Sequence, residues 1–205
     1  MRTASYLEHQ NPSILDRFGR WLSQRRLHCH LNGASGLVVA DIGCGFEAAL
    51  TAPFASKVDR LILVDVSLNE ALATADNTQL ILGQLPAVLE QIDDATVDLV
   101  ICNNVVEHVW EDQRLLNELH RIVKPGGRVC VNVPSWLGKW ALEFCSFRLG
   151  LVPVAEIEDH KRYYDPRELW PLLVAAGFKP SKILCFRHKF WLNTYATAIR
   201  DPEPE

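Results

Sequence analysis

Apolar runs and helix-like patterns alternate along most of this chain. Four apolar runs have the length of a strand, and they cover residues 37–42, 60–65, 97–102 and 127–133. The segments between them are long enough for crossover helices. Parallel neighbouring strands require such crossovers, because a short turn can only reverse the chain. The alternation therefore predicts an α/β fold with a parallel sheet covered on both faces.

Three segments show the pattern of helices. Residues 12–31 place apolar side chains at helical spacing: Ile14, Leu15, Phe18, Trp21 and Leu22. Residues 111–123 have acids in the first turn, an apolar stripe and basic residues at the end, which suits the helix dipole. A third helix is predicted after Asp165, with Pro166 in its first turn and Gly177 beyond its end.

Two further strand-like runs close the chain, at residues 182–186 and 191–199. Their connection is too short for a crossover, so they are predicted to form an antiparallel pair.

Composition excludes several classes of protein. The chain has 205 residues with a formal charge of −4 and a pI near 6.0, which gives no general attraction for nucleic acid or anionic lipid. It has no apolar stretch of the roughly 18 residues that span a membrane, and its start lacks the apolar region of a signal peptide. Six scattered cysteines without a CxxC pair argue against a disulfide framework or a zinc site. We therefore expect a reducing compartment, the cytoplasm.

The stretch VVADIGCGFEAAL, residues 38–50, ends a predicted strand in a glycine turn. Gly43 and Gly45 allow the backbone to turn sharply and to approach a ligand closely. Asp65 ends the next predicted strand, and an acid at that place can accept hydrogen bonds from both hydroxyls of a ribose. The pair of features predicts a cofactor that carries a nucleoside.

Two cofactors remain open at this point. GCGFEA satisfies the G-x-G-x-x-G/A pattern of an NAD(P)-dependent oxidoreductase. However, Asp41 lies two residues before the first glycine, where it can reach an ammonium group or orient the loop, and where it would repel a pyrophosphate. The chain also lacks a Tyr-x-x-x-Lys pair that would serve such an oxidoreductase.

The ordered set VVADIGCG, ILVD, DLVICNNVVEHV, RIVKPGGRVCVNVP and ELWPLLVAAGF resembles the class I S-adenosylmethionine-dependent methyltransferases. The likeness covers roughly residues 37–199 and is greatest to the small-molecule group with a type 11 methyltransferase domain, which includes ubiquinone-biosynthesis-like enzymes. It implies a single Rossmann-like α/β domain with a seven-stranded, mostly parallel sheet of order 3-2-1-4-5-7-6. Strand 7 would be antiparallel, helices would cover both faces, and S-adenosylmethionine would be the cofactor.

The resemblance also assigns the cofactor site, residue by residue. The implied contacts are Asp41, Gly43, Cys44 and Gly45 at the methionine end, Asp65 and Val66 at the ribose, Gln84 and Leu85 at the adenine, and Asn103 at the crevice mouth. Two positions depart from the family pattern. Gln84 stands where an aspartate is usual, and Glu47 stands at the usual third glycine. Because of these departures, the alternative stays open that the chain is a non-catalytic partner protein that keeps the methyltransferase fold.

Methyl transfer requires the nucleophile in line behind the methyl group, and a base only if the acceptor must lose a proton. His108 and His160 are the candidate catalytic residues, and Asp159 or Glu158 could orient His160. A structural role for His108 and an exposed loop position for His160 are the alternatives. His188 is expected to be solvated. No compact spacing of histidine and acid residues indicates a metal site.

An insertion of residues 134–164 follows the predicted fifth strand. One helical face carries Trp136, Trp140, Phe144, Phe147 and Leu151. It could be a substrate lid, a weak membrane-surface contact or core; core plus lid is favoured, because membrane-surface helices carry more Lys and Arg.

Two loop stretches, HKRYYDPRELWPLL and FRHKFWLN, resemble methyltransferases of surface-glycan biosynthesis. This resemblance implies a small-molecule or lipid-linked sugar acceptor, methylated on oxygen. Asn103 and Asn104 do not form the Asn/Asp-Pro-Pro-aromatic motif of enzymes that methylate DNA bases, and no nucleic-acid partner is expected. The oligomeric state and the acceptor's identity stay open.

The whole chain is expected to be one methyltransferase domain, residues 1–205. Its expected parts are an N-terminal helical cap (1–36), a cofactor-binding half (37–133), the lid (134–164), and a C-terminal helix with a strand pair (165–199).

Overall fold

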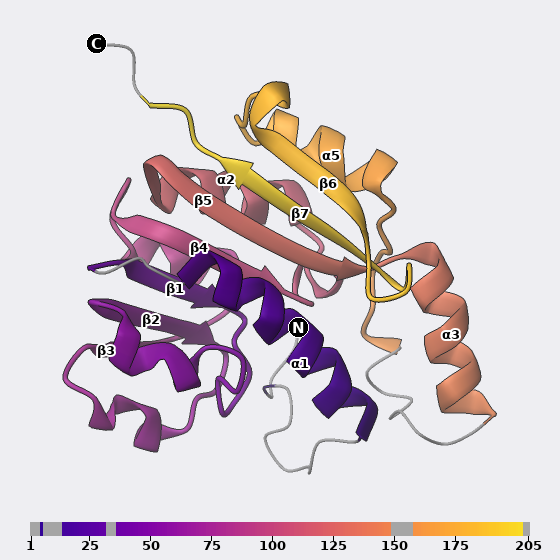
Figure 1. The fold of residues 1–205 in the computed structure, drawn as a ribbon, viewed down its shortest axis with the longest axis horizontal. Helices are drawn as coiled ribbons and strands as arrows, with labels where there is room; N and C mark the ends of the chain where they lie inside the picture. The colour runs from indigo at the N-terminus through magenta and orange to yellow at the C-terminus, as the bar shows by residue number, and fades with distance from the viewer. Residues whose placement is uncertain (1–4, 6–13, 32–35, 149–157, 203–205) are drawn as a thin grey trace.

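The computed structural model describes residue 5 and residues 14–31, 36–148 and 158–202. A twisted seven-stranded sheet runs through its centre (Figure 1). The strands are β1 (Val38–Ile42), β2 (Arg60–Asp65), β3 (Thr78–Leu82), β4 (Val97–Asn103), β5 (Val123–Pro134), β6 (Ile183–His188) and β7 (Asn193–Ile199). Their order is β3-β2-β1-β4-β5-β7-β6, and β7 runs antiparallel to both of its neighbours. The predicted order and the predicted antiparallel pair are confirmed.

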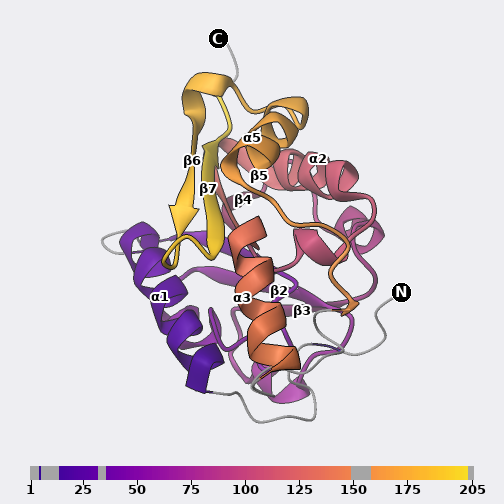
Figure 2. The ribbon, with the colours of Figure 1, turned by 90° about the vertical axis from the view of Figure 1, so that its right-hand side faces the viewer.

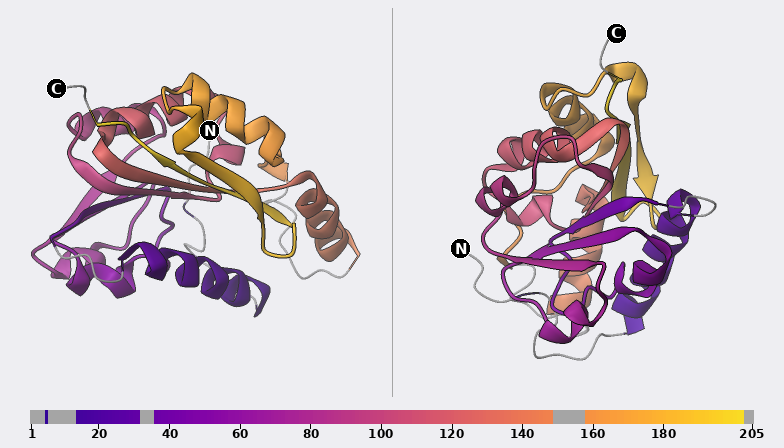
Figure 3. Two further views of the ribbon diagram at one scale, coloured as in Figure 1. Left: turned by 45° about the horizontal axis from the view of Figure 1, so that its top comes forward. Right: turned by 90° about the vertical axis from the view of Figure 1, so that its left-hand side faces the viewer.

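Alternate side chains of the strands build a core on each face of the sheet. Ala40, Ile42 and Val64 pack with α2 (Asp112–Ile122) and α5 (Pro166–Ala175) on one face. Val39, Leu63 and Ile101 pack with α1 (Ile14–Leu31) on the other. Figure 3 shows this layering, with α1 on one side of the sheet and α2 and α5 on the other. Burial on both faces explains why these strands are nearly continuous apolar runs.

The crossovers before β4 differ from the prediction. They contain short 3-10 helices rather than α-helices: η1 (Ala52–Lys57), η2 (Glu70–Thr74) and η3 (Ala87–Gln91). Pro53 lies at the start of η1 and Pro86 directly precedes η3. The crossover between β4 and β5 does contain an α-helix, α2, which follows the short 3-10 helix η4 (Val106–His108).

The helices α2 and α5 confirm their sequence signals. The predicted stripe of α2 is fully buried at Leu115, Leu119 and Ile122. At the start of α5 the Glu168 carboxylate accepts a hydrogen bond of 2.7 Å from the Asp165 N–H, which satisfies one of the free donors of the first turn. Gly177 follows the helix with a φ of +110°, a conformation that glycine adopts readily.

The apolar face predicted for the first helix is only partly turned to the core. In α1 the side chains of Phe18 and Trp21 are exposed, whereas Ser23, Leu27 and Leu31 face the sheet. The helix therefore packs through a face that the spacing of its largest apolar residues did not indicate.

The prediction that the aromatic stripe of residues 134–164 forms core is wrong. In α3 (Trp136–Phe147) the stripe is exposed, and Gly138 and Ser146 on the opposite side are buried. A Cβ at Gly138 would lie 2.0 Å from the Leu192 carbonyl oxygen, so the helix packs through its small residues and turns its large ones outward. Leu151 lies outside the described residues. Within the described part of the chain, no helix combines the length and apolarity that crossing a bilayer requires.

Candidate functional site

The glycine turn after β1 lies at the carboxyl ends of the central strands. Gly43 and Gly45 have φ angles of +70° and +77°. The Gly43 N–H donates a hydrogen bond of 2.7 Å to the Val64 carbonyl, which fixes the turn against β2. A Cβ at Gly43 would lie 2.4 Å from a methyl carbon of Val105, in the turn after β4. Glycine is required here both by the backbone angle and by the close approach of this second turn.

Asp41, in β1, is joined by a hydrogen bond to the segment that follows this turn. Its side chain is 1% exposed, and the Thr51 hydroxyl donates a hydrogen bond of 2.6 Å to its Oδ2. Burial raises the pKa of Asp41 to about 7, and the charge of nearby Asp65 adds to the increase, while the Thr51 hydrogen bond opposes it. Two roles were predicted for Asp41, to reach an ammonium group or to orient the loop. The hydrogen bond from Thr51 fits the second role.

Asp65 joins the turns after β1 and β2. Its Oδ2 accepts a hydrogen bond of 2.8 Å from the Gly45 N–H, and its Oδ1 accepts one of 2.7 Å from the Val66 N–H. The Ser5 hydroxyl also lies at hydrogen-bonding distance from Oδ1, and it contacts the Ser67 carbonyl at 2.5 Å. The carboxylate is thus already engaged by a hydroxyl group, the same donor that a ribose would offer.

The predicted adenine residues come to the same edge of the sheet. Asp65 pairs with Leu82 across β2 and β3, and the Gly83 N–H donates to the Asp65 carbonyl at 3.0 Å. Gln84 follows directly and is half-buried, whereas Leu85 packs against the core. Gln84, the residue predicted to contact adenine, therefore lies near Asp65, the residue predicted to contact the ribose. Leu85 also contributes to packing of the core.

Cys44 packs against the core on the α1 side of the sheet. Burial raises the pKa of its thiol well above the usual value, and the nearby carboxylates of Asp41 and Asp65 act in the same direction. The thiol therefore stays protonated and unreactive.

Four asparagines gather where β4 and β5 end and β7 begins. The Asn103 side chain accepts a hydrogen bond of 3.3 Å from the Ser23 hydroxyl, which ties the crevice mouth to α1. Asn104, with a φ of +56°, accepts from the amides of Asn132 at 2.9 Å and Asn193 at 3.4 Å. Sequence reasoning missed Asn132, although a buried polar residue inside the apolar run VCVNV was a visible signal.

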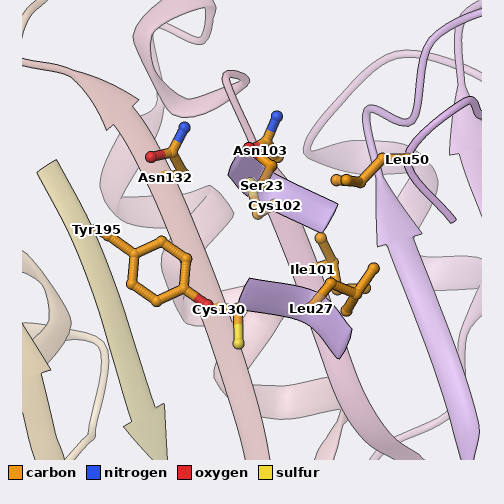
Figure 4. A pocket seen from close by; sticks show the side chains of 9 residues that line it. All are labelled: Ser23, Leu27, Leu50, Ile101, Cys102, Asn103, Cys130, Asn132 and Tyr195. Atoms are coloured by element: carbon orange, nitrogen blue, oxygen red, sulfur yellow. The ribbon is translucent and has the colours of Figure 1, made fainter. Parts of the chain in front are cut away.

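A small cavity beneath this cluster is shown in Figure 4. It lies between α1, β4, β5 and β7, and its lining includes Ser23, Asn103, Asn132 and Tyr195. Its volume is about 20 Å³, which accommodates roughly one water molecule. A nucleoside therefore has to bind outside it, in the crevice beyond the strand ends.

The two candidate catalytic histidines lie side by side in the fold. Their ring centroids lie 4.7 Å apart, although 52 residues separate them in the sequence. Nδ1 of His108 lies 2.9 Å from Oδ2 of Asp159, and Nδ1 of His160 lies 3.0 Å from the Tyr163 hydroxyl. Asp159 was predicted to orient His160, but the structure pairs it with His108. Lys161 contacts the second oxygen of Asp159 at 2.9 Å.

The same cluster offers ligands for a cation. One ligand atom each from Glu107, His108 and His160 lies within 4.8 Å of the others, and Glu107 is 1% exposed. Sequence spacing did not indicate this set, because the tertiary fold brings residue 160 back to residues 107 and 108. A carboxylate and two imidazoles are ligands that zinc and other divalent cations accept.

The end of β6 and the link to β7 contain two titratable residues in unexpected surroundings, His188 and Lys189. His188 is half-buried rather than solvated, and burial lowers its pKa to about 4, so it is neutral at physiological pH. Burial also lowers the pKa of the Lys189 ammonium to about 8, although nearby Glu107 favours its charge. Lys189, Phe190 and Trp191 all have positive φ, which nothing in their sequence indicates.

Comparison with known proteins adds to this geometry. A family model described as a methyltransferase domain matches residues 40–131, from β1 through β5. The ubiquinone biosynthesis O-methyltransferase of Rickettsia typhi is 26% identical over 155 residues, which cover 72% of this chain and 62% of that protein. That of Idiomarina loihiensis is 28% identical over 195 residues, which cover 85% and 79%.

The matching domain and these relatives support the resemblance of the chain to the class I S-adenosylmethionine-dependent methyltransferases. For several of the curated relatives, the match spans less than two thirds of the relative's own length.

Solved methyltransferase structures share the fold. Magnesium protoporphyrin IX methyltransferase from Synechocystis PCC 6803 with bound SAH gives a TM-score of 0.63 at 18% identity, covering 94% of this chain and 89% of that one. A methyltransferase in complex with the Haloferax volcanii Trm112 activator gives 0.68 at 17% identity, covering 90% and 92%.

S-adenosylmethionine is the cofactor of this methyltransferase family, and the residues present fit it. Asp65 presents a carboxylate that already contacts a hydroxyl, as a ribose requires. The glycines of the first turn leave no side chain between the backbone and the crevice. Asp65, Val66 and Gln84 would hold the nucleoside, and the turn of Gly43 to Gly45 would face the methionine portion.

Proposed function

We propose that this methyltransferase transfers the methyl group of S-adenosylmethionine to an oxygen atom of a small or lipid-linked acceptor. The observation that carries this proposal is the contact between His108 and Asp159 at 2.9 Å. An imidazole oriented by a carboxylate is a general base, and a hydroxyl acceptor needs one because it must lose a proton. The names of the relatives, O-methyltransferases, support oxygen as the methylated atom.

His108 and Asp159 divide the proton transfer between them. With Nδ1 held by Asp159, Nε2 of His108 takes the proton from the acceptor hydroxyl. Bound S-adenosylmethionine would supply the methyl group to that oxygen, and the electron pair of its carbon–sulfur bond would stay on sulfur in a neutral thioether. The carboxylate of Asp159 stabilises the imidazolium that forms.

His160 and Tyr163 form the neighbouring wall of the acceptor site. The adjacent rings of His108 and His160 restrict the approach of the acceptor, and the hydroxyl of Tyr163 fixes His160. Burial raises the pKa of Tyr163 to about 12, so this hydroxyl stays protonated and does not compete as a base.

Two classes of acceptor follow from the two sources of support. The relatives named for ubiquinone biosynthesis favour an aromatic hydroxyl, and the loop residues that resemble glycan-modifying enzymes favour a sugar hydroxyl. Either could be lipid-linked. The six free cysteines suit a reducing compartment, and we propose the cytoplasm.

The first test is calorimetric titration with S-adenosylmethionine, its demethylated product and NADH. We expect both nucleosides to bind and NADH not to bind. Asp65→Ala should weaken nucleoside binding about 100-fold, because it removes the ribose acceptor and leaves the Gly45 N–H unpaired. Asp59→Ala, at an exposed acid just before β2, is the matched control and should bind as the wild type does. Binding of NADH, or equal binding by Asp65→Ala, would contradict the cofactor site.

The second test measures transfer of a radiolabelled methyl group to catechol and to octyl glucoside, which represent the two hydroxyl classes. Methylation of either on oxygen supports the proposal, and the preferred one identifies the class. Cofactor binding without transfer to either would favour a non-catalytic partner protein. An EDTA arm distinguishes the roles of the histidine cluster. Activity that survives EDTA supports His108 as a base, whereas activity lost and then restored by Mg²⁺ or Zn²⁺ would assign Glu107, His108 and His160 to a cation.

A further inference from the structure

One end of the molecule carries exposed aromatic side chains from three separate segments. Figure 2 looks onto this end, where the link between β6 and β7 lies between α1 and α3. We call it the basic aromatic face and define its aromatic members as Phe18 and Trp21 of α1, Phe190 and Trp191 of the link, and Trp140, Phe144 and Phe147 of α3.

Direct contacts hold the three segments beside one another. In α1 the rings of Phe18 and Trp21 are stacked with centroids 5.9 Å apart, and Phe18 also stacks on Phe190 of the link at 6.5 Å. At the start of α3 the Ser135 hydroxyl donates a hydrogen bond of 2.7 Å to the Trp191 carbonyl. The face is therefore fixed by the fold and does not depend on loose side chains.

Its exposure is high for such large apolar residues. Phe190 is 76% exposed, Trp140 71% and Trp191 63%. Single exposed apolar residues are ordinary, but a contiguous group marks an interaction surface. The link also holds Phe190 and Trp191 outward with φ angles of +57° and +70°, and non-glycine residues adopt such angles at a cost in free energy.

Cations surround the aromatic residues on the α1 side. The 18 residues of α1 include four arginines and a single acid. The Arg25 guanidinium lies 5.1 Å from the centre of the Trp21 ring, and Arg17 and Arg20 line an open hollow of about 460 Å³. Among the residues that the structure describes, no carboxylate forms an ion pair with these three arginines. This local positive charge contrasts with the formal charge of −4 of the whole chain.

We propose that the basic aromatic face binds the surface of an anionic phospholipid bilayer. Tryptophan and phenylalanine insert at the boundary of headgroups and acyl chains, and arginines beside them meet the lipid phosphates. The charge in α3 is nearly self-compensated, because Lys139 and Glu143 pair at 2.6 Å. The aromatic residues of α3 and the arginines of α1 therefore complement each other only in the folded protein.

The face adjoins the histidine cluster. Trp136 of α3 lies 5.7 Å from the Tyr163 ring, and the Tyr163 hydroxyl contacts His160. Bilayer binding itself does not depend on methyl transfer. If the proposed function holds, this position also brings a lipid-linked acceptor close to His108 without leaving the membrane.

The test is co-sedimentation of the full chain with two kinds of vesicle, pure phosphatidylcholine and a mixture with 30% phosphatidylglycerol. We expect binding to the anionic vesicles, weaker binding to the neutral ones, and loss of the difference in 0.5 M salt, which screens the arginines. Intrinsic tryptophan fluorescence should shift to the blue only with the anionic vesicles.

Two sets of variants assign the binding to the face. Trp140→Ser with Phe144→Ser should weaken vesicle binding at least about tenfold, because two exposed aromatic side chains that would insert into the bilayer are lost. Arg17→Gln with Arg25→Gln should weaken it about 30-fold in low salt. The matched controls are Leu82→Ser with Leu184→Ser, exposed apolar residues on the two edge strands, and Arg114→Gln, an exposed arginine of α2. The controls should bind as the wild type does.

Three results would overturn the proposal. The first is equal binding to both kinds of vesicle at every salt concentration, and the second is equal loss in the control variants. The third is no vesicle binding together with a dimer, in sedimentation equilibrium, that Trp140→Ser with Phe144→Ser dissociates; the face would then be an interface between copies of the chain. Thermal unfolding of each variant, expected to match the wild type, excludes misfolding as the cause.

Discussion

The predicted cofactor site and the histidine cluster are built in different ways. On the cofactor side, main-chain N–H groups join the turns after β1 and β2, as in the hydrogen bonds from the Gly43 N–H to the Val64 carbonyl and from the Gly45 N–H to the Asp65 carboxylate. On the acceptor side, side chains from segments about 50 residues apart meet, as in the contact of His108 with Asp159. The cofactor side is therefore a property of local sequence, and the acceptor side is a property of the assembled fold. Each prediction below tests one part of this difference.

The largest effect is expected on the acceptor side. His108→Gln should lower kcat about 100- to 10,000-fold, the usual contribution of a general base, while cofactor affinity stays unchanged. Asp159→Asn should lower kcat less, because it removes the negative charge that would stabilise the His108 imidazolium. The measurement is transfer to the better of the two model acceptors, alongside titration with S-adenosylmethionine.

His28→Gln, at an exposed histidine of α1, is the control for this pair. A large loss of cofactor affinity in His108→Gln would mean that the two sides of the crevice are not separate, and it would assign His108 to cofactor packing.

On the cofactor side, Gly43→Ala should lower the free energy of unfolding by about 3 kcal/mol, since it adds both a left-handed alanine and a clash with Val105. Gly126→Ala separates the two causes. Gly126 has a similar φ of +79° but open space around it, so its loss should be about 1–2 kcal/mol. Urea denaturation measures both.

A second substitution tests the clash directly. Val105→Ala combined with Gly43→Ala should be less destabilising than the sum of the two single changes. Strict additivity would show that Val105 does not restrict the turn.

The smallest effect concerns Ser5, whose hydroxyl contacts the carboxylate that a ribose would use. Ser5→Ala should tighten the binding of S-adenosylmethionine about fivefold, because the ligand no longer displaces an internal hydrogen bond. Ser56→Ala, at an exposed serine of η1, serves as the control. Weaker binding by Ser5→Ala would show instead that this hydroxyl helps to hold the ligand.

Local patterns predicted most of the sheet and the position of the glycine turn. The apolar runs of β1, β2, β4 and β5, the capped helix α5 and the glycine turn are encoded within a few residues each, and their positions agree with the structure. The third strand and the strand order came from the resemblance to known methyltransferases. Periodicity failed for α1 and α3, because it finds a helical face but not the direction that the face takes.

By itself, the sequence determined the α/β alternation, the antiparallel last pair and the position of the glycine turn, since these depend on hydrophobic period, on glycine and on the length of the last connection. Only the tertiary structure decided that His108 pairs with Asp159, that Glu107 and His160 join them, and that the aromatic residues of α3 face outward beside the arginines of α1. These relations arise from packing between distant segments. Gly138 against Leu192 illustrates the reason: contact of a small residue with a backbone carbonyl selects the buried face of a helix, and no local pattern records it.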